Sequence, residues 1–178
     1  MFFNVAIRSD QASTLADFTS PGLLVPRLDA RDVTGVIQEL SRALAREARV
    51  PDSFVFHEAV LKREAQASSQ MESGMAFPHA RLAGLKELSF AFGRGNEPLV
   101  WRVGGAASVR LVFLLAVPAD DPAQHLRLIS GLSRLSRDGR LMKQLRSVPD
   151  AGQLFELFQQ VPLAAATGSV NSPKPILT

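Results

Sequence analysis

Apolar residues recur with a helical period in the first third of the chain. Between residues 28 and 49 they stand three and four positions apart, as in an amphipathic helix, at Val33, Val36, Ile37, Leu40 and Leu44. This helix is predicted to end near Arg49. A second helix is predicted to begin after Asp52 or Ser53, either of which is a good N-cap, and to run to about Ala67.

The middle of the chain contains short extended segments separated by turn-forming residues. Residues 75–77 form an apolar piece that Pro78 is expected to end, because proline lacks the N–H that a strand ladder needs. A strand is predicted at 88–92, closed by a turn at 93–96, and a further strand at 99–103.

The second half of the chain predicts a buried strand followed by helices. Residues 109–117 are apolar at all but one position and rich in branched and aromatic side chains, so we expect a central strand buried on both faces. An aspartate N-cap and Pro122 open a helix that is predicted to reach about Arg137, and shorter helices follow at 141–148 and 154–161. Alternating strands and helices predict an α/β domain with a mixed sheet.

The two ends of the chain carry weaker patterns. Residues 1–27 have no clear period and are interpreted as an N-terminal extension with at most a short strand. Residues 162–178 are small, polar or proline and predict a flexible C-terminal tail. We therefore expect a single domain at residues 28–161.

Composition narrows the class of protein. The 178 residues are 46% hydrophobic and 21% charged, as in one globular domain. The absence of cysteine excludes disulfides, thiol nucleophiles and cysteine-bound metals. The opening residues lack the features of a secretory signal, and no apolar run approaches the length of a membrane span. We expect a soluble cytoplasmic protein without direct membrane insertion.

The positive charge is too small to predict a nucleic-acid partner. The formal net charge is only +3, and the pI of about 9.9 reflects a chain without tyrosine or cysteine to titrate below lysine. A local basic run nevertheless follows residue 133, at Arg134, Arg137, Arg140, Lys143 and Arg146. Steps of three drift around a helix, so we interpret the run as a solvated face, with a partner-docking patch as the alternative.

Candidate chemistry centres on histidine, since the chain has no nucleotide-binding glycine motif and no common serine-nucleophile motif. His79 follows Pro78 at a predicted strand end, where α/β proteins place their sites. A neutral imidazole is a competent nucleophile near pH 7, because its reference pKa is about 6.5. Phosphorylation of one ring nitrogen requires a proton on the other and cations around the phosphoryl oxygens.

Several residues could supply those interactions. Arg63 offers a bidentate guanidinium, and His125 lies one turn into a predicted helix whose free N–H groups favour an anion. Ser68 and Ser69 add hydroxyl donors for a phosphoryl group. Spacing alone does not bring these residues together, so ordinary packing remains the alternative for each histidine.

Five segments carry a resemblance to one family. The run from Gly74 to Arg81 reads GMAFPHAR and resembles the phosphorylation-site motif of the fructose, mannitol and nitrogen-regulatory group of phosphotransferase-system enzyme IIA domains. Upstream, LKRE at 61–64 resembles the family's Arg-Glu pair. Downstream, VFLLAVP at 112–118 followed by HLRLI at 125–129 resembles its strand and second histidine, and PLVW at 98–101 its Pro-aliphatic-Trp segment.

The resemblance covers residues 28–160 and implies a function. Its fold would be a mixed sheet flanked by helices on both faces. His79 would accept a phosphoryl group from the phosphohistidine of HPr, with Arg63 and His125 stabilising it, and pass it to an enzyme IIB domain. No cofactor and no metal is implied. The alternative is a nitrogen-regulatory type of enzyme IIA, which docks on a regulatory protein target in a phosphorylation-dependent manner.

Two features depart from the family pattern. The loop before the motif has Glu72 where the family usually has glycine, which removes an easy positive φ and places a carboxylate near the expected phosphoryl group. We expect Glu72 to point outward into solvent. His57 matches no motif and is interpreted as structural, although a metal site formed by His57, His79 and His125 is a distant third hypothesis.

Overall fold

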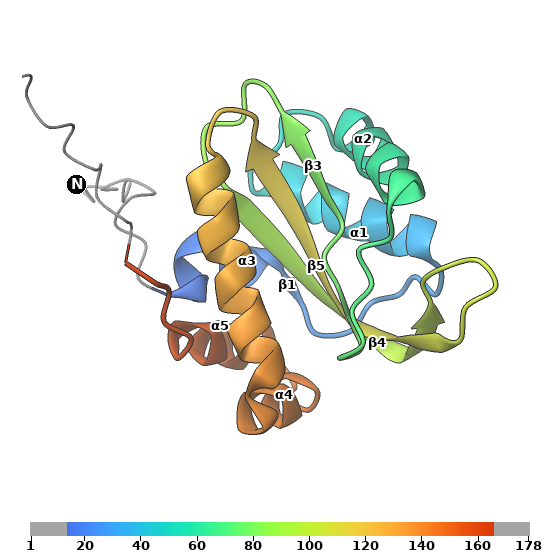
Figure 1. The fold of residues 1–178 in the computed structure, drawn as a ribbon, viewed down its shortest axis with the longest axis vertical. Coiled ribbons are helices and arrows are strands. Elements are labelled where there is room, and N and C mark those ends of the chain that lie inside the picture. The colour runs from blue at the N-terminus through green and yellow to red at the C-terminus, as the bar shows by residue number, and fades with distance from the viewer. Residues whose placement is uncertain (1–13, 166–178) are drawn as a thin grey trace, which may run out of the picture.

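A mixed sheet of five strands forms the centre of the fold in the computed structural model, which describes residues 14–165 (Figure 1). The strands are β1 (Leu24–Val25), β2 (Met75–Ala76), β3 (His79–Leu82), β4 (Ser89–Val100) and β5 (Ala107–Pro118). Their order is β1-β4-β5-β2, with β3 also paired to β5. Only β4 and β5 pair antiparallel. The predicted α/β fold with a mixed sheet is confirmed.

Five helices cover the two faces of this sheet. They are α1 (Val33–Arg46), α2 (Ser53–Gln66), α3 (Pro122–Arg137), α4 (Gly139–Leu145) and α5 (Ala151–Gln159). In Figure 1, α1 and α2 lie on one side of the sheet and α3, α4 and α5 on the other. Each begins after an aspartate whose side chain accepts backbone N–H groups of the first turn, namely Asp32, Asp52, Asp121, Asp138 and Asp150. The helices predicted at 141–148 and 154–161 in fact begin two and three residues earlier, directly after Asp138 and Asp150.

The central strand β5 divides the interior into two cores. Leu111, Phe113 and Leu115 are fully buried on the side of α3, α4 and α5, whereas Val112 and Leu114 are fully buried on the side of α1 and α2. Alternate residues of a strand face opposite ways, so an almost continuous apolar run fills both cores. The predicted central strand is confirmed.

Part of the expected N-terminal extension packs into the domain. Two short 3₁₀ helices, η2 (Leu15–Phe18) and η3 (Pro21–Leu23), precede β1. The side chains of Leu15 and Phe18 are buried in the core beneath α3 and α5. Residues 1–13, and residues 166–178 of the expected tail, lie outside the described part of the chain. Within that described part, no helix is long and apolar enough to cross a membrane.

The predicted turn at 93–96 and the separate strand at 99–103 are wrong. Strand β4 runs through this region with an irregular register against β5. Gly93 is small for a packing reason, since a Cβ there would lie 2.6 Å from a methyl carbon of Leu28. A glycine required by close packing was thus interpreted as a glycine required by a turn.

The strand that was expected to stop at Pro78 instead resumes at the next residue. β2 and β3 are two pieces of one edge, both parallel to β5, and Pro78 joins them. The Pro78 carbonyl accepts a hydrogen bond from the Leu115 N–H at 2.9 Å. An edge strand needs only one side of its backbone for pairing, so the missing N–H of proline is tolerated there. His79 is therefore the first residue of a strand.

Candidate active site

His79 is half-buried at the edge of the sheet, and its tautomer is fixed by the backbone. Its Nδ1 lies 3.0 Å from the Phe77 carbonyl oxygen. A carbonyl can only accept a hydrogen bond, so Nδ1 carries the proton and donates it. The lone pair of the neutral ring is consequently on Nε2, which is the nitrogen left free to act as a nucleophile.

His125 lies beside His79 and has the complementary tautomer. The two ring centroids are 5.4 Å apart and the rings are tilted by 52°. Nη2 of Arg81 approaches Nδ1 of His125 at 3.2 Å. Because a guanidinium can only donate, this Nδ1 accepts, and the neutral ring carries its proton on Nε2. That Nε2 is buried and has no hydrogen-bond partner among the described residues.

The environment of His125 keeps its ring neutral at pH 7. Burial is the main cause, and the neighbouring His79 and Arg81 add to it, so that the pKa of His125 falls from 6.5 to about 4. A neutral ring whose Nε2–H has no partner among the described residues keeps the capacity to donate a hydrogen bond to an anion.

Cationic side chains surround the other side of His79. A hollow of about 470 Å³ between α2 and β3 is lined by Ala59, Lys62, Arg63, Gln66, His79, Ala80 and Arg81. Arg63 donates from Nη1 to the Ala67 carbonyl at 3.2 Å, at the C-terminal end of α2. The structure thus brings the predicted residues Arg63, His79 and His125 into one neighbourhood.

Arg81 and Lys62 contribute charge that the sequence analysis did not assign. Arg81 contacts His125 and lines the hollow with His79. Residues two apart on a strand point to the same face, so the signal for Arg81 was present in the sequence. It was missed because the strand was expected to end at Pro78, which left no reason to pair Arg81 with His79.

The two predicted serines lie close to the site but do not line the hollow. The Ser68 hydroxyl accepts from the Gln70 N–H at 3.3 Å. The Ser69 carbonyl accepts from the Phe77 N–H at 3.2 Å, and its hydroxyl is buried without a partner among the described residues. Their binding of a phosphoryl group stays a prediction.

Glu64 anchors the loop that contains Ser68 and Ser69, called the serine loop below, to the sheet. Its Oε1 accepts from the Ser69 N–H at 2.7 Å and from Nε1 of Trp101 at 2.8 Å. Trp101 is 5% exposed, so its indole N–H depends on this carboxylate for a partner. The serine loop, which bonds to Phe77, is therefore held in place by Glu64 of α2. Trp101, which follows β4, in turn holds Glu64.

The structure shows how the loop before the motif accommodates Glu72 in place of the usual glycine. Glu72 is exposed, as expected, and its backbone does not require a positive φ. The positive φ occurs instead at Gly74, at 80°, where a Cβ would also come within 3.0 Å of the Ser108 carbonyl oxygen. The turn before the motif therefore depends on the glycine that this chain retains.

His57 lies in a different environment. It is buried in α2, with Nε2 3.3 Å from the Thr34 carbonyl oxygen and Nδ1 3.3 Å from an oxygen of Glu58. Residues 14–165 contain no group of three or more histidine, aspartate or glutamate side chains placed to hold a metal ion. The interpretation of His57 as a structural residue agrees with these contacts.

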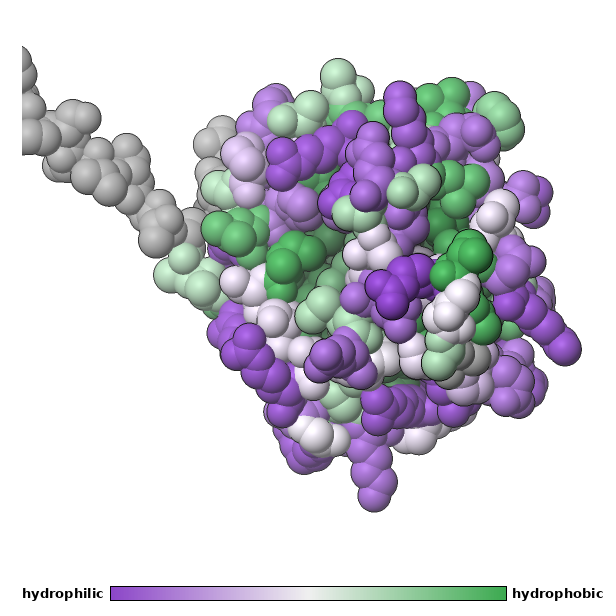
Figure 2. All heavy atoms as spheres, turned by 45° about the vertical axis from the view of Figure 1, so that its right-hand side comes forward, coloured by the Kyte–Doolittle hydropathy of each residue, from purple (hydrophilic) through white to green (hydrophobic). Residues whose placement is uncertain are grey.

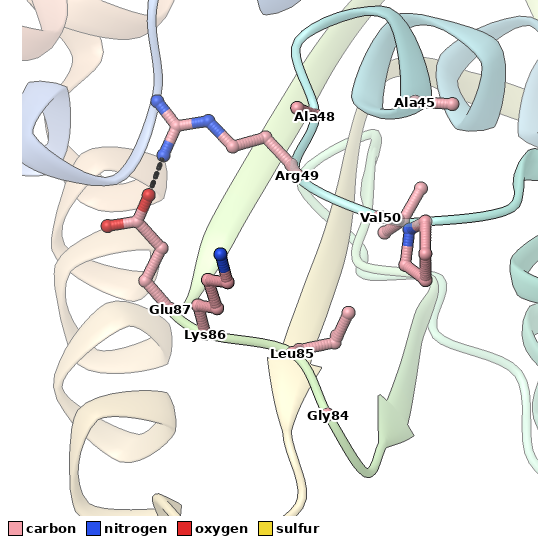
Figure 3. A pocket seen from close by; sticks show the side chains of 9 residues that line it. Ala45, Ala48, Arg49, Val50, Gly84, Leu85, Lys86 and Glu87 are labelled. Atoms are coloured by element: carbon pink, nitrogen blue, oxygen red, sulfur yellow. Dashed lines mark hydrogen bonds and ion pairs between the residues drawn. The ribbon is translucent and has the colours of Figure 1, made fainter.

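A separate hollow of about 370 Å³ lies between the loop after α1 and the loop after β3 (Figure 3). Arg49 and Glu87 form an ion pair across it at 2.6 Å. Its lining contains none of the residues that surround His79. This hollow is therefore separate from the one beside His79.

Comparison with known proteins shows the family to which the chain belongs. The family model described as "Phosphoenolpyruvate-dependent sugar phosphotransferase system, EIIA 2" matches residues 17–161. The chain belongs to this family. The match begins inside η2 and thus includes part of the segment that the sequence analysis treated as an extension.

Relatives within the family include regulatory and transport proteins. A nitrogen regulatory protein of Bradyrhizobium diazoefficiens is 30% identical over 85% of this chain and 99% of its own length. A fructose-specific EIIABC component of Bacillus subtilis is 27% identical over 75% of this chain, which covers 21% of that protein. This chain thus spans nearly the whole length of the nitrogen regulatory protein, but only about a fifth of the EIIABC component.

Solved structures share the fold. Nitrogen regulatory protein IIA-Ntr from Neisseria meningitidis superposes with a TM-score of 0.70 at 24% identity, covering 81% of this chain and 98% of that one. The mannitol IIA of Escherichia coli gives a TM-score of 0.66 at 17% identity, covering 78% of this chain and 97% of its own. The fold resemblance that the sequence motifs implied is confirmed.

Proposed function

We propose that the protein is a phosphocarrier that accepts a phosphoryl group on Nε2 of His79 from the phosphohistidine of an HPr-type protein. Family membership supports a phosphotransferase function. The observation that carries the assignment to His79 is the pair of complementary tautomers, with a free lone pair on His79 and an unpartnered N–H on His125.

The transfer follows from these positions. The Nε2 lone pair of His79 attacks the phosphorus of the incoming phosphohistidine, while the phosphorus–nitrogen bond of the donor breaks and its electron pair returns to the donor ring. The proton on Nδ1 of His79 stays in the hydrogen bond to Phe77. Charge spreads over the three equatorial oxygens in such a transition state. We expect the Nε2–H of His125 and the guanidinium of Arg63 to stabilise this charge.

Residues around the site suit a protein partner. Leu126 follows His125 directly and is 70% exposed. An exposed apolar side chain beside the reactive ring offers a carrier protein a modest contact from which it can leave. Figure 2 shows one face of the molecule, on which hydrophilic side chains predominate and hydrophobic ones form small, separate patches.

The test is labelling with phosphoenolpyruvate, enzyme I and HPr. We expect a mass increase of one phosphoryl group that is lost in acid and absent from His79→Ala. Labelling of His79→Ala at the rate of the unchanged protein would overturn the assignment. His57→Gln serves as the matched control, because it removes a histidine outside the site and should leave labelling unchanged.

The downstream role has two candidates. Transport would pass the group to an enzyme IIB domain, and a solved complex of mannitol enzyme IIA with phosphorylated enzyme IIB from Escherichia coli has the same fold for its IIA component, with a TM-score of 0.65. Regulation is favoured by the relatives that this chain spans along nearly their whole length. Those from Bradyrhizobium diazoefficiens and Pseudomonas aeruginosa are both named nitrogen regulatory protein, at 99% and 96% of their lengths.

A transfer assay separates the two roles. The phosphorylated protein is mixed with purified enzyme IIB domains from the same cell. Loss of the label from His79 to an enzyme IIB supports transport. Retention of the label, together with a regulatory protein that binds only one of the phosphorylated and His79→Ala forms, supports regulation.

A further inference from the structure

The basic run that the sequence analysis singled out is brought together around a second hollow. This hollow, of about 360 Å³, lies at the junction of α3 and α4 and is lined by Ser73, Ser136, Arg137, Gly139, Met142, Lys143 and Arg146. None of these residues lines the hollow beside His79. Three cations, Arg137, Lys143 and Arg146, line this hollow. In one continuous helix their spacing would spread them around the axis, but α3 ends and α4 begins at Asp138, which brings them together.

The charges of these three residues are not neutralised by acidic partners. Among the described residues, Arg137, Lys143 and Arg146 form no ion pair. Arg137 donates to the Ser133 hydroxyl at 3.3 Å, and Arg146 donates to the Ser73 carbonyl at 3.1 Å. Each guanidinium has five N–H donors, so most of this donor capacity remains available.

A buried hydroxyl in the same lining also lacks a partner. The Ser73 Oγ is inaccessible to solvent and makes no hydrogen bond among the described residues. A buried hydroxyl without a partner is unfavourable, so such groups are uncommon unless something binds to them. The unpartnered Ser73 hydroxyl is thus a second observation at the same hollow, independent of the positive charges.

We propose that this hollow binds a small molecule carrying a phosphate group. Guanidinium groups match phosphate oxygens in bidentate geometry, and an ammonium adds a point charge. The volume is in the range of small-ligand pockets, and the nearly buried Met142 offers an apolar wall for the rest of the molecule. The Ser73 Oγ, which is inaccessible to solvent in the unliganded protein, turns about its Cα–Cβ bond and donates its hydroxyl to the bound phosphate.

The proposal does not depend on phosphorylation of His79, and the experiment keeps the two apart. Inorganic phosphate is titrated into the His79→Ala protein at fixed ionic strength, and the amide shifts of Ser73 and Gly139 are followed by NMR. We expect saturable shifts at these residues. Replacing Lys143 with glutamine is expected to weaken binding about tenfold, the usual worth of one charge-assisted hydrogen bond.

Matched variants guard against a loss of fold or a general charge effect. Ser73→Ala is expected to weaken phosphate binding while leaving the unfolding midpoint unchanged or higher, since it removes only an unsatisfied hydroxyl. The double variant Arg134→Gln/Arg140→Gln removes two exposed charges of the same run outside the lining, and affinity is expected to stay within about twofold.

Three outcomes would overturn the proposal. The first is the absence of saturable shifts at Ser73 and Gly139, and the second is an equal loss of affinity in the control double variant. The third is binding of an acidic peptide such as hexaglutamate at these residues without any binding of phosphate, which would indicate a docking surface for a protein.

Discussion

The hollow beside His79 and the hollow beside Ser73 are each lined by three cationic side chains. They differ in whether hydrogen bonds orient the neutral polar groups beside those charges. Beside His79, two imidazoles have tautomers fixed by Phe77 and Arg81. Beside Ser73, by contrast, the Ser73 hydroxyl has no hydrogen-bond partner among the described residues that would orient it. Positive charge attracts an anion to both places, but a covalent bond to phosphorus requires an oriented lone pair, which only the first provides.

Removal of the second imidazole tests this difference most strongly. His125→Ala deletes the Nε2–H donor, and we expect the rate of His79 phosphorylation to fall about 100-fold, the usual effect of losing one donor to a charged transition state. Residual labelling should remain, because Nε2 of His79 is untouched. Rapid-quench labelling measures the rate, and an unchanged rate would reduce His125 to a packing role.

The anchoring of the serine loop is the next test. Glu64→Ala leaves the Trp101 indole N–H and the Ser69 N–H without their acceptor, and we expect the free energy of unfolding to fall by about 2 kcal/mol. Trp101 is the only tryptophan, so its emission reports the site directly and should shift to longer wavelength. Glu97→Ala, at an exposed position of β4, is the control and should change neither property.

Arg81 gives a smaller effect with a distinctive signature. Arg81→Gln removes a positive charge beside His125 and weakens control of its tautomer, so we expect phosphorylation to slow about tenfold. The pKa of His125 should also rise, because one of the causes that depress it is gone. NMR titration of the ring measures the pKa. A purely structural role for Arg81 predicts slower labelling without that rise.

The depressed pKa of His125 also makes the stability of the protein depend on pH. The pKa of His125 is depressed from 6.5 to about 4, so the unfolded chain binds more protons than the folded chain between these values. Stability therefore falls as the pH drops from about 6.5 to about 4 and changes no further from this cause below that. Urea unfolding across this range should show a shallower dependence in His125→Gln. Identical slopes in both proteins would contradict the assignment.

How far the sequence predicts this molecule depends on whether the signal is local. The helices were predictable because aspartate caps mark their starts, and β5 was predictable because its apolar run is long. The predictions at Pro78 and Gly93 were wrong because the roles of these residues depend on neighbours distant in the chain. Pro78 lies on an edge strand paired with β5, and Gly93 packs under Leu28.

The site divides in the same way. His79, His125 and Arg63 were found through motifs that keep fixed spacings. Arg81 was not found, because its role depends on a strand that begins at His79. The hollow at Ser73 joins residues more than sixty positions apart, and no period in the sequence indicates that Arg146 meets the Ser73 carbonyl.

The most direct test of the central claim is the identity of the phosphorylated atom. The protein, labelled with ¹⁵N in its histidines, is phosphorylated and examined for coupling between phosphorus and ring nitrogen by NMR. The account predicts coupling to Nε2 of His79, with Nδ1 still protonated in its hydrogen bond to Phe77. Coupling to Nδ1 of His79, or to either nitrogen of His125, would contradict it.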